Sequence, residues 1–463
     1  MKRRDFFSSV FGVLGGISAT SVFPEEDNRF IFRHQGKQSP AIAGNVRVAV
    51  IGVGNRGKKH LLQLGMLDDT EIVGLCDLRE ESITSALSQL RAVSKRPVEK
   101  IHVYKEGPLD YKRMLAQSRP DAVYICTPWD WHEQMALDCL DLDINALVEI
   151  PLAVTVRGCA RIVERAKRSR ASCMVLENVC FGEEELTFKE IVHSGLLGEI
   201  GYAEGAYVHD LRHRLADVDS GHGSGVWRVN HWATRSGNLY PTHAVGPISK
   251  YLGCYQESGD YFQSLSSFSS PARNHREWVT RFSKPDSKLR KIDFRGGDTN
   301  ITMIRTSKNR LIKLVWDEST PRPYTRTNRV QGTRGVAVGF PTRFSLDFMR
   351  GESPLPLEIY SKLSSSERTN FHKWTDEEKT EVVMRAFRPE ILKVDWEKSL
   401  SLKGGHPGMD GLMNMRVIRN LREGAPLDIS IEESAAWSMI AELSERSNRL
   451  GGQPVSFPND LLS

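Results

Sequence analysis

The chain lacks the features that mark several classes of protein. Its seven cysteines are an odd number with no CxxC pair among the 463 residues, so neither a disulfide framework nor a structural zinc is indicated. No apolar run is long enough to span a bilayer. Lysine and arginine exceed aspartate and glutamate by only five, which is no electrostatic footprint for nucleic acid. We therefore expect no metal, no nucleic-acid partner and no stable membrane insertion.

The N-terminus has a pattern typical of export signals. Basic residues 2–4 and the pair Phe6-Phe7 precede a short, mildly apolar stretch at residues 10–23. Such a pattern is typical of a secretory signal, and the paired arginines followed by Phe-Phe resemble the twin-arginine signal, which exports folded proteins. We expect residues 1–24 to be a twin-arginine-type signal peptide, residues 25–44 a linker, and the protein to be periplasmic. A disordered basic tail on a cytoplasmic protein is the alternative.

A glycine-rich turn follows the first apolar strand, in the sequence VRVAVIGVGNRG at residues 46–57. Gly52 permits a tight turn, Gly54 lets the backbone approach a pyrophosphate, and Gly57 lets the next helix pack closely on the strand. Asp77 ends the second apolar run, where it can accept the ribose hydroxyls of NAD and would repel the 2′-phosphate of NADP. The alternative is a structural glycine turn in another α/β fold. The predicted NAD-binding residues here are Gly52, Gly54, Asn55, Arg56, Gly57 and Asp77.

The pattern after this turn alternates apolar strands with helices. Residues 121–127 and 145–149 are nearly continuous apolar runs, as expected of buried parallel strands, and residues 131–142 between them have helical spacing. This order predicts an α/β fold with a doubly wound parallel sheet, whose ligand lies at the carboxyl ends of the strands. We expect this Rossmann domain to span residues 45–177. Candidate cofactor-binding residues at its strand ends are Thr127, Trp129, His132 and Glu149, although Trp129 is equally compatible with core packing.

A second pattern begins at about residue 185, with several strands joined by turn-rich loops. We expect a C-terminal α+β domain at residues 178–463, built on an open, mainly antiparallel sheet. The expected strands are residues 199–209, 260–268, 300–306, 311–317 and 326–332. The expected helices are residues 185–194, 410–422 and 431–448, the last opening with the capping box Ser430-x-x-Glu433. Residues 216–226 are rich in Gly, Ser and Asp and predict a flexible loop, a candidate lid. Residues 335–400 give no clear pattern.

Several sequence blocks carry a family resemblance. The glycine turn, the Cys126-Thr127-Pro128 step and Glu149-Ile150-Pro151 together resemble the Gfo/Idh/MocA family, which pairs a Rossmann domain with an open-sheet domain. Closer still is glycoside hydrolase family 109, and the resemblance covers roughly residues 45–460. The blocks that carry it include Leu176-Glu177-Asn178, Tyr207-x-His209-Asp210-Leu211-Arg212, Trp227-Arg228, Gly237 to His243, Arg322-Pro323-Tyr324 and Gly405 to Asp410.

That resemblance implies an α-N-acetylgalactosaminidase with tightly bound NAD that is regenerated in each turnover. It also implies pairing of subunits through the open sheet, and it adds Asn178 to the cofactor-binding residues. Dehydrogenase members usually have E-K-P, where the lysine assists proton transfer, but Ile150 takes that position here. Phe181 replaces a tyrosine that the hydrolases usually have, which removes a hydroxyl.

Such a hydrolase oxidises the sugar at C3, eliminates the aglycone, adds water and reduces C3 again, so it needs an acid/base group and hydrogen-bond donors. His243 is the best candidate base because imidazole titrates nearest neutral pH. Tyr240 and Tyr324 are candidate catalytic phenols. A structural histidine at a helix start and a half-buried tyrosine are the alternatives for His243 and Tyr324. Candidate substrate-binding residues are His209, Asp210, Arg212, Trp227, Arg228 and His406. Capping for His209 and Asp210, and an enforced turn for His406, stay open.

The sequence thus predicts a periplasmic glycosidase that acts on N-acetylgalactosaminide-like glycosides, retains its NAD and forms a homo-oligomer. Its partner is a small carbohydrate or glycoconjugate. An NAD-dependent sugar or polyol oxidoreductase is the first alternative, and the absence of the E-K-P lysine argues against it. A non-catalytic sugar sensor is the second, and His243 and Tyr324 argue against that.

Overall fold

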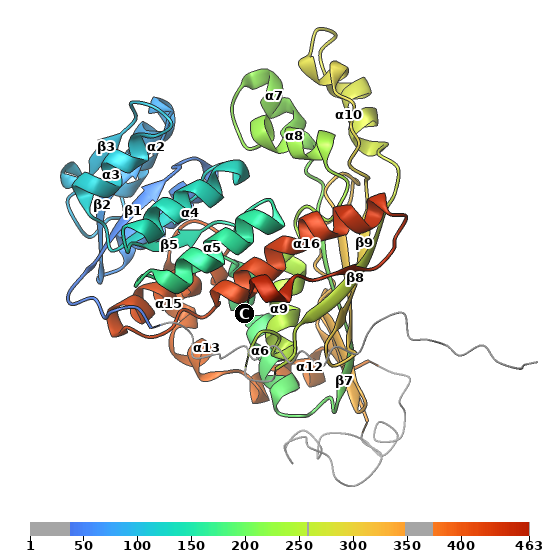
Figure 1. The fold of residues 1–463 in the computed structure, drawn as a ribbon. Helices are drawn as coiled ribbons and strands as arrows, with labels where there is room; N and C mark the ends of the chain where they lie inside the picture. The colour runs from blue at the N-terminus through green and yellow to red at the C-terminus, as the bar shows by residue number, and fades with distance from the viewer. Residues whose placement is uncertain (1–37, 257–258, 348–373, 463) are drawn as a thin grey trace, which may run out of the picture.

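The protein contains two sheets, and the computed structural model describes residues 38–256, 259–347 and 374–462 of the chain. The first sheet is parallel, with the order β3-β2-β1-β4-β5-β6 (Figure 1). Its strands are β1 (Val46–Ile51), β2 (Thr70–Cys76), β3 (His102–Tyr104), β4 (Ala122–Ile125), β5 (Asn145–Val148) and β6 (Cys173–Val175). The order reverses between β1 and β4, which is the switch point of a doubly wound sheet. The predicted Rossmann-type fold is confirmed.

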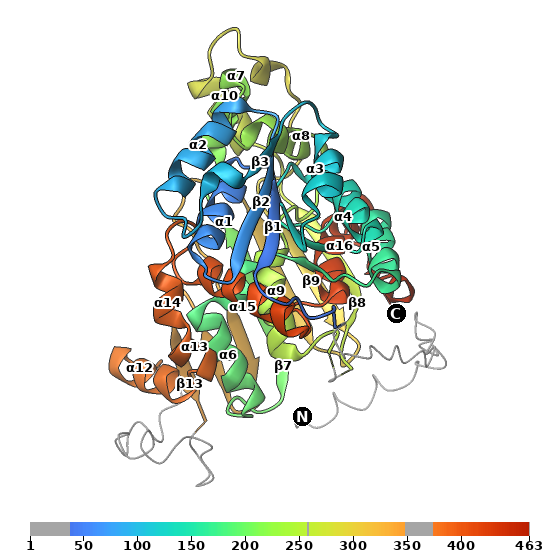
Figure 2. The same cartoon turned by 90° about the vertical axis from the view of Figure 1, so that its left-hand side faces the viewer.

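Helices cover both faces of this sheet (Figure 2). They are α1 (Asn55–Met66), α2 (Glu80–Arg91), α3 (Asp110–Ser118), α4 (His132–Asp141) and α5 (Val156–Arg168), with short 3-10 turns η1 (Val98–Lys100), η2 (Trp129–Trp131) and η3 (Asn178–Phe181). Every residue of β4, β5 and β6 is buried as a result. Burial on both faces explains why these strands read as continuous apolar runs instead of alternating ones.

The second sheet has the order β13-β12-β11-β7-β10-β9-β8-β14. Its strands are β7 (Ile200–Val208), β8 (Phe262–Ser269), β9 (Asn300–Thr306), β10 (Leu311–Asp317), β11 (Arg329–Gly332), β12 (Gly335–Val338), β13 (Arg343–Leu346) and β14 (Val455–Ser456). Only the β7–β10 pair is parallel among these described strands. The predicted open and mainly antiparallel sheet is therefore confirmed.

The helices of the second half pack mainly on one face of this sheet, where α9 and α16 lie against β7 and β8 (Figure 1). They are α6 (Glu183–His193), α7 (Ala216–Ser220), α8 (Gly225–Thr234), α9 (Thr242–Leu252), α10 (Asn274–Phe282), α12 (Glu377–Ala386), α13 (Glu390–Val394), α14 (Trp396–Ser401), α15 (Met409–Glu423) and α16 (Ile431–Arg449). Short 3-10 turns are η4 (Arg212–Leu215), η5 (Lys288–Lys291) and η6 (Asn459–Leu461). The predicted capping box of Ser430 and Glu433 is present at the start of α16.

One sequence-based interpretation needs correction. The sequence predicts one flexible loop at residues 216–226, but α7 occupies residues 216–220 and α8 begins at Gly225, so only residues 221–224 form a turn. The Asp217 carboxylate accepts a hydrogen bond from the Gly225 amide and so ties the two helices together, an interaction that composition does not reveal. The predicted linker also contains ordered contacts: the Ser39 hydroxyl lies 2.6 Å from that of Ser172, and Ile42 donates to the Leu421 carbonyl. The predicted signal peptide lies outside the described residues.

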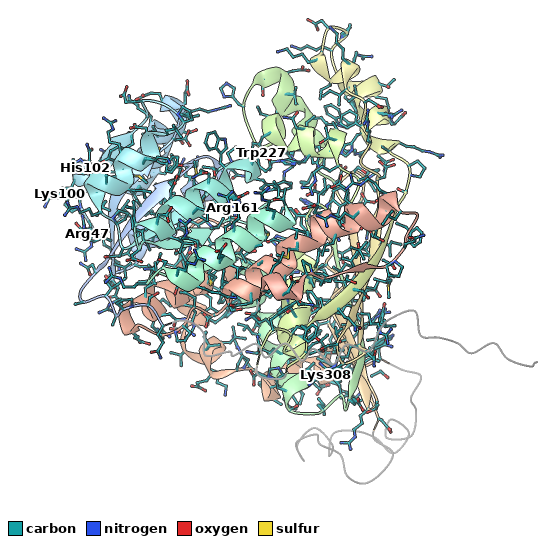
Figure 3. The ribbon with its side chains drawn as sticks, in the orientation of Figure 1. Arg47, Lys100, His102, Arg161, Trp227 and Lys308 are labelled. Carbon is teal, nitrogen blue, oxygen red and sulfur yellow. The ribbon has the colours of Figure 1, made fainter. Side chains whose placement is uncertain are left out.

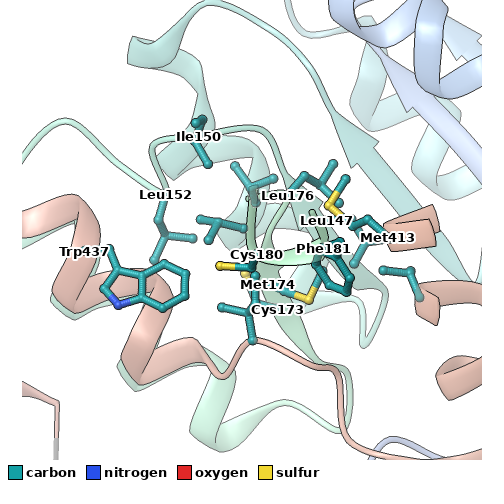
Figure 4. Close-up of a cluster of buried hydrophobic side chains, with 14 of the residues drawn as sticks. Leu147, Ile150, Leu152, Cys173, Met174, Leu176, Cys180, Phe181, Met413 and Trp437 are labelled. Atoms are coloured by element: carbon teal, nitrogen blue, oxygen red, sulfur yellow. The ribbon is translucent and has the colours of Figure 1, made fainter. Parts of the chain in front are cut away.

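Helix α16 joins the two halves of the molecule. The Ser438 and Ser434 hydroxyls accept hydrogen bonds from the backbone amides of Leu152 and Val175, in the first half, at 2.9 and 3.2 Å. Trp437 packs in the same cluster as Leu152, Met174 and Cys180 (Figure 4). One continuous core therefore crosses the boundary between the two sheets. In the described part of the chain, no helix has the length and apolar character needed to cross a bilayer.

Candidate active site

The glycine turn between β1 and α1 has the geometry of a dinucleotide cradle. Gly52 has φ +82°, and a Cβ there would lie 2.6 Å from the Cys126 carbonyl oxygen. A Cβ at Gly57 would lie 1.8 Å from the Gly52 carbonyl oxygen, so only glycine allows α1 to approach this closely. At Gly54 a Cβ would meet no atom within 4 Å. The turn therefore leaves open space beside the N-terminus of α1, where a pyrophosphate fits.

Asp77 stands at the end of β2, next to this turn. Its carboxylate accepts hydrogen bonds from the Val53 amide at 2.8 Å and from the Arg79 amide at 2.9 Å. Each carboxylate oxygen accepts one of these bonds and keeps a further lone pair. Asp77 therefore fixes the shape of the turn and still has acceptors for ribose hydroxyls. Asn55, at the first position of α1, is exposed beside it.

A buried ionic network lies behind the turn and contains two of the predicted cofactor residues. The Arg56 guanidinium donates to Glu149 at 2.9 Å and to Asp410 at 2.8 Å, and His60 Nε2 lies 2.8 Å from Glu149. Burial alone would raise the pKa of Glu149, but Arg56 and His60 lower that pKa well below its usual range. Glu149 is therefore ionised, and its Oε1 accepts from both Arg56 and His60, which suits it to hold the strand end in place.

Thr127 follows the end of β4, and Asn178 follows the end of β6. Asn178 is buried, and its amide donates to Asp410 at 2.7 Å. Thr127 is partly exposed and its hydroxyl lies 3.5 Å from the Met135 sulfur. That these residues, with Arg56 and Glu149, bind the cofactor stays a prediction. 

His132 differs from the other candidates, because it is fully buried. Its Nδ1 lies 2.7 Å from the Pro151 carbonyl oxygen and its Nε2 lies 2.9 Å from that of Thr127. Both ring nitrogens thus face backbone carbonyls, and the side chain presents no surface to a cofactor. The sequence predicts that His132 contacts the cofactor, but it instead links the loop after β4 to the loop after β5.

His243 lies in the first turn of α9, two residues after Pro241. Its Nδ1 lies 2.7 Å from an oxygen of Glu177, which is fully buried and precedes η3. The second Glu177 oxygen has no hydrogen-bond partner within the described residues. A carboxylate acceptor holds the proton on Nδ1, so His243 Nε2 carries a free lone pair and can act as a base.

Two tyrosines contact His243, and a third lies next to one of them. The Tyr240 and Tyr207 rings stack with centroids 4.6 Å apart, and each meets the His243 ring edge-on at 5.0 and 5.1 Å. Tyr324 contacts Tyr207 at 5.9 Å and His209 at 5.2 Å. The structure thus brings together all three predicted catalytic side chains. Burial raises the pKa of the Tyr240 phenol, so that hydroxyl stays protonated and can serve as a hydrogen-bond donor.

Arg228 lies in an aromatic cage that spans the two halves of the protein. Its guanidinium lies 4.9 Å from the Trp129 ring, 5.1 Å from the Trp227 ring and 5.3 Å from the Tyr240 ring. It also donates to the fully buried Glu318 at 3.0 Å. Trp227 belongs to helix α8 (labelled in Figure 3), and its ring meets that of Trp129, from the first half, at 4.9 Å. A buried cation next to Tyr240 favours negative charge there.

The remaining substrate candidates differ in whether their side chains are already paired within the protein. Asp210 and Arg212 pair with each other through two hydrogen bonds of 2.9 Å, which reduces what either offers to a ligand. His209 Nδ1 is buried and has no partner in the described chain. His406 is exposed, and its backbone amide donates to Asp410 at 2.8 Å. Within residues 38–256, 259–347 and 374–462, no group of three or more His, Cys, Asp or Glu side chains is arranged to hold a metal.

Comparison with known proteins identifies the family. The family model "Glycosyl hydrolase 109, C-terminal domain" matches residues 181–461, and "Oxidoreductase family, NAD-binding Rossmann fold" matches residues 46–177. The chain is 39% identical over 415 residues to glycosyl hydrolase family 109 protein 1 of Akkermansia muciniphila, covering 89% of this chain and 81% of that protein. It is 36% identical over 417 residues to the α-N-acetylgalactosaminidase of Shewanella oneidensis, covering 89% and 84%.

The chain belongs to glycosyl hydrolase family 109. It is an enzyme, and its cofactor is NAD, in agreement with the glycine cradle. Levoglucosan dehydrogenase, solved with NADH and levoglucosan, has a similar fold, with TM-score 0.62 and 16% identity over 89% of this chain and all of that one. The apo scyllo-inositol dehydrogenase of Lactobacillus casei has TM-score 0.58 and 12% identity, covering 89% and 98%.

Position 150 is the place of the lysine that the family resemblance assigns to dehydrogenase members. Ile150 is buried and apolar, so no amine is available at the place where the sequence analysis expects the dehydrogenase lysine. Phe181 is buried too and packs in the cluster that contains Leu147 and Met413 (Figure 4). Its ring therefore serves packing instead of forming part of the site surface.

Sequence reasoning missed four residues that complete this site. Tyr207, Glu177 and Asp410 lie inside blocks that carry the family resemblance, so a signal existed, although it did not show which residue each would contact. Glu318 gave no signal. It comes from the end of β10 and meets Arg228 and Trp232 only through the fold.

Proposed function

We propose that this protein is a glycosidase that hydrolyses N-acetylgalactosaminide-like glycosides and keeps its NAD bound through each turnover. The observation that carries the proposal is the contact between His243 and the buried Glu177, which supplies a base. The buried Ile150 supports a hydrolase over a dehydrogenase, because the usual lysine is absent. The relative from Shewanella oneidensis is named α-N-acetylgalactosaminidase, which supports the choice of sugar.

The cofactor would be held at the glycine turn, with Gly54 at the pyrophosphate and Asp77 at the ribose. When bound, NAD supplies a hydride acceptor for C3 of the sugar and returns that hydride later, so no net oxidation occurs. The N-terminus of α1 offers free amides to the phosphates, since no side chain caps it.

His243 then has a defined task. A carbonyl at C3 acidifies the neighbouring C2 proton, which the free lone pair of His243 Nε2 removes. Glu177 accepts from Nδ1, so it fixes the ring orientation and stabilises the imidazolium that forms. Loss of the C2 proton forms a C1–C2 double bond and breaks the bond from C1 to the aglycone oxygen. Water later adds at C1, and the imidazolium returns the proton to C2.

The phenols supply protons and hydrogen bonds. Tyr240 stays protonated because of burial, and its hydroxyl is suited to stabilise the enolate oxygen, with the Arg228 cation behind its ring. Tyr324 accepts a long 3.4 Å hydrogen bond from Arg326, so its own proton is free to point elsewhere. We assign Tyr324 to protonation of the departing aglycone oxygen, and the phenolate that this leaves takes up the proton of the water that adds at C1.

One experiment separates this proposal from its alternatives. The purified protein, without added NAD, is incubated with p-nitrophenyl α-N-acetylgalactosaminide and, separately, with free sugars. Nitrophenol release without accumulation of NADH is the expected result. Stoichiometric NADH that forms only when NAD and a free sugar are added would instead identify an oxidoreductase. If neither nitrophenol nor NADH forms in the two assays, the proposed substrate is contradicted. Export by the N-terminal signal and assembly into a homo-oligomer stay proposals.

A further inference from the structure

A series of aromatic rings runs outward from His243. The His243 and Tyr207 ring centroids are 5.1 Å apart, those of Tyr207 and Tyr324 are 5.9 Å apart, and those of Tyr324 and Phe340 are 6.2 Å apart. Solvent exposure rises along the series, from 9% at Tyr207 to 38% at Tyr324 and 39% at Phe340. The series therefore leads from the base to the protein surface.

Phe340 is held in an unusual backbone conformation. Its φ is +60°, a left-handed value that a bulky side chain rarely adopts. The flanking residues are pinned: the Gly339 amide donates to the Asn328 carbonyl at 2.8 Å, and the Thr342 hydroxyl donates to Glu184. Strain of this kind persists only where the surroundings enforce it, and it gathers at functional sites. Here the enforced result is an aromatic ring left open to solvent.

Arg326 supports this ring from one side. Its guanidinium lies 4.9 Å from the Phe340 centroid and 5.8 Å from the Tyr324 centroid, and it is fixed by a 2.7 Å bond to the buried Glu185. Because the cation covers one face of Phe340, the exposed part of the ring lies away from Arg326. A cation behind an aromatic ring also holds that ring rigidly.

We propose that Phe340, together with Tyr324, forms a binding surface for a sugar in the aglycone. The apolar C–H face of a pyranose packs on an aromatic ring and is removed from water there. This inference rests on the proposed function and deepens it, because it names Phe340 as a residue that contacts the sugar beyond the cleaved bond.

The test compares two substrates that differ only in the aglycone. One is methyl α-N-acetylgalactosaminide, and the other is the disaccharide in which the same sugar is α-linked to galactose. The variant Phe340→Ala removes the ring, and Phe340→Tyr keeps it. Phe282→Ala, on α10, is the matched control because Phe282 is exposed but lies outside the ring series. We expect Phe340→Ala to lower kcat/KM for the disaccharide about 10-fold, and for the methyl glycoside hardly at all, while Phe340→Tyr and Phe282→Ala preserve both.

Two results would overturn the inference. Equal losses on both substrates would mean that Phe340 only supports the structure, and no loss on either would mean that it contacts no aglycone. If the wild-type protein hydrolyses neither substrate, the proposed function fails, and binding of the disaccharide by saturation-transfer NMR decides the inference. Weaker transfer in Phe340→Ala than in wild type would support the sugar surface. Equal transfer, or none in wild type, would refute it.

Discussion

Single residues in this protein owe their roles to partners far away in the sequence. His243 could be recognised from its own block, but Glu177, which orients it, lies 66 residues earlier. Tyr240 contacts His243 directly, whereas Tyr324 is connected to it through Tyr207, a residue of β7. Residue types and local spacing indicate which chemistry is available. They do not show which carboxylate meets which imidazole, because that pairing is set by the packing of strands and helices.

Substitution Glu177→Gln tests the pairing with His243. The amide keeps the size of the side chain, but it loses the charge that stabilises imidazolium and permits the wrong tautomer. We expect glycosidase kcat to fall by about 10²–10⁴, with a changed pH–rate profile and unchanged NAD content. Glu133→Gln, in a partly exposed pair with Arg161, is the control. Activity within a few-fold of wild type would contradict the assigned role.

Two glycines of the same turn give opposite predictions. A Cβ at Gly54 would meet nothing within 4 Å, whereas one at Gly57 would lie 1.8 Å from the Gly52 carbonyl oxygen. We expect Gly54→Ala to fold normally and lose NAD, because the methyl occupies the space for the pyrophosphate. Gly57→Ala should lower the free energy of unfolding by about 1–3 kcal/mol. Thermal melts and the NAD released on denaturation measure both. A Gly54→Ala protein that retains full NAD would refute the cradle.

A helix or strand could be predicted where the spacing of apolar residues along the sequence matches the side of the element that is buried. Strands β9 and β10 have the predicted bounds, because one face of each alternates with the other in burial. Helix α7 and the start of α8 could not be predicted from a segment rich in Gly, Ser and Asp, since the hydrogen bond from the Gly225 amide to the Asp217 carboxylate forms only once the two helices are in place. Strands β12 and β13 lie where no pattern was evident, and each has only four residues.

The first turn of α6 contains a carboxyl with a perturbed pKa. Burial, and next the Glu185 carboxylate, raise the pKa of Glu184 from 4.5 to about 7. The folded state thus holds a proton that the unfolded chain releases, so this contribution to stability is present below pH 4.5 and is lost as pH rises through about 7. Glu184 also accepts a hydrogen bond from the Thr342 hydroxyl. The loss of stability at high pH therefore affects the segment that carries Phe340.

Substitution Glu184→Gln should remove this pH dependence. Between pH 5 and 9 we expect, to order of magnitude, the variant to gain about 1–3 kcal/mol of unfolding free energy relative to wild type. Chemical denaturation at several pH values measures the difference. Glu183→Gln, on the same turn but exposed and paired with Arg388, provides the comparison and should track wild type. Parallel pH profiles for all three proteins would show that Glu184 ionises normally.

At the scale of the whole molecule, the two halves also meet beside the ribose position. Arg79, two residues after Asp77, donates to the Gly221 carbonyl at 2.6 Å and lies 2.8 Å from His222 Nδ1, both in the turn between α7 and α8. This contact spans from the Rossmann sheet to the second half. It connects the segment after the cradle with the helices that carry Trp227 and Arg228.

Removal of this contact should make bound NAD dissociate faster. We expect Arg79→Ala to increase the rate of NAD loss about 10-fold, the effect of a charged hydrogen bond, without a change in fold. Displacement of bound NAD by a fluorescent analogue measures the rate. Arg91→Ala, which removes an exposed pair with Glu99, should behave as wild type. An unchanged rate in Arg79→Ala would show that the contact does not retain the cofactor.

The return of α15 and α16 to the first sheet has a consequence for biosynthesis. Asp410 pairs with Arg56, and Ser434 and Ser438 bond backbone amides of the Rossmann half. A nascent chain still lacking residues 404–462 would have its first half synthesised but its strand ends unsupported. The Arg56–Asp410 pair behind the cradle therefore forms only after residue 410 has been synthesised, so the first half cannot complete this support by itself during synthesis.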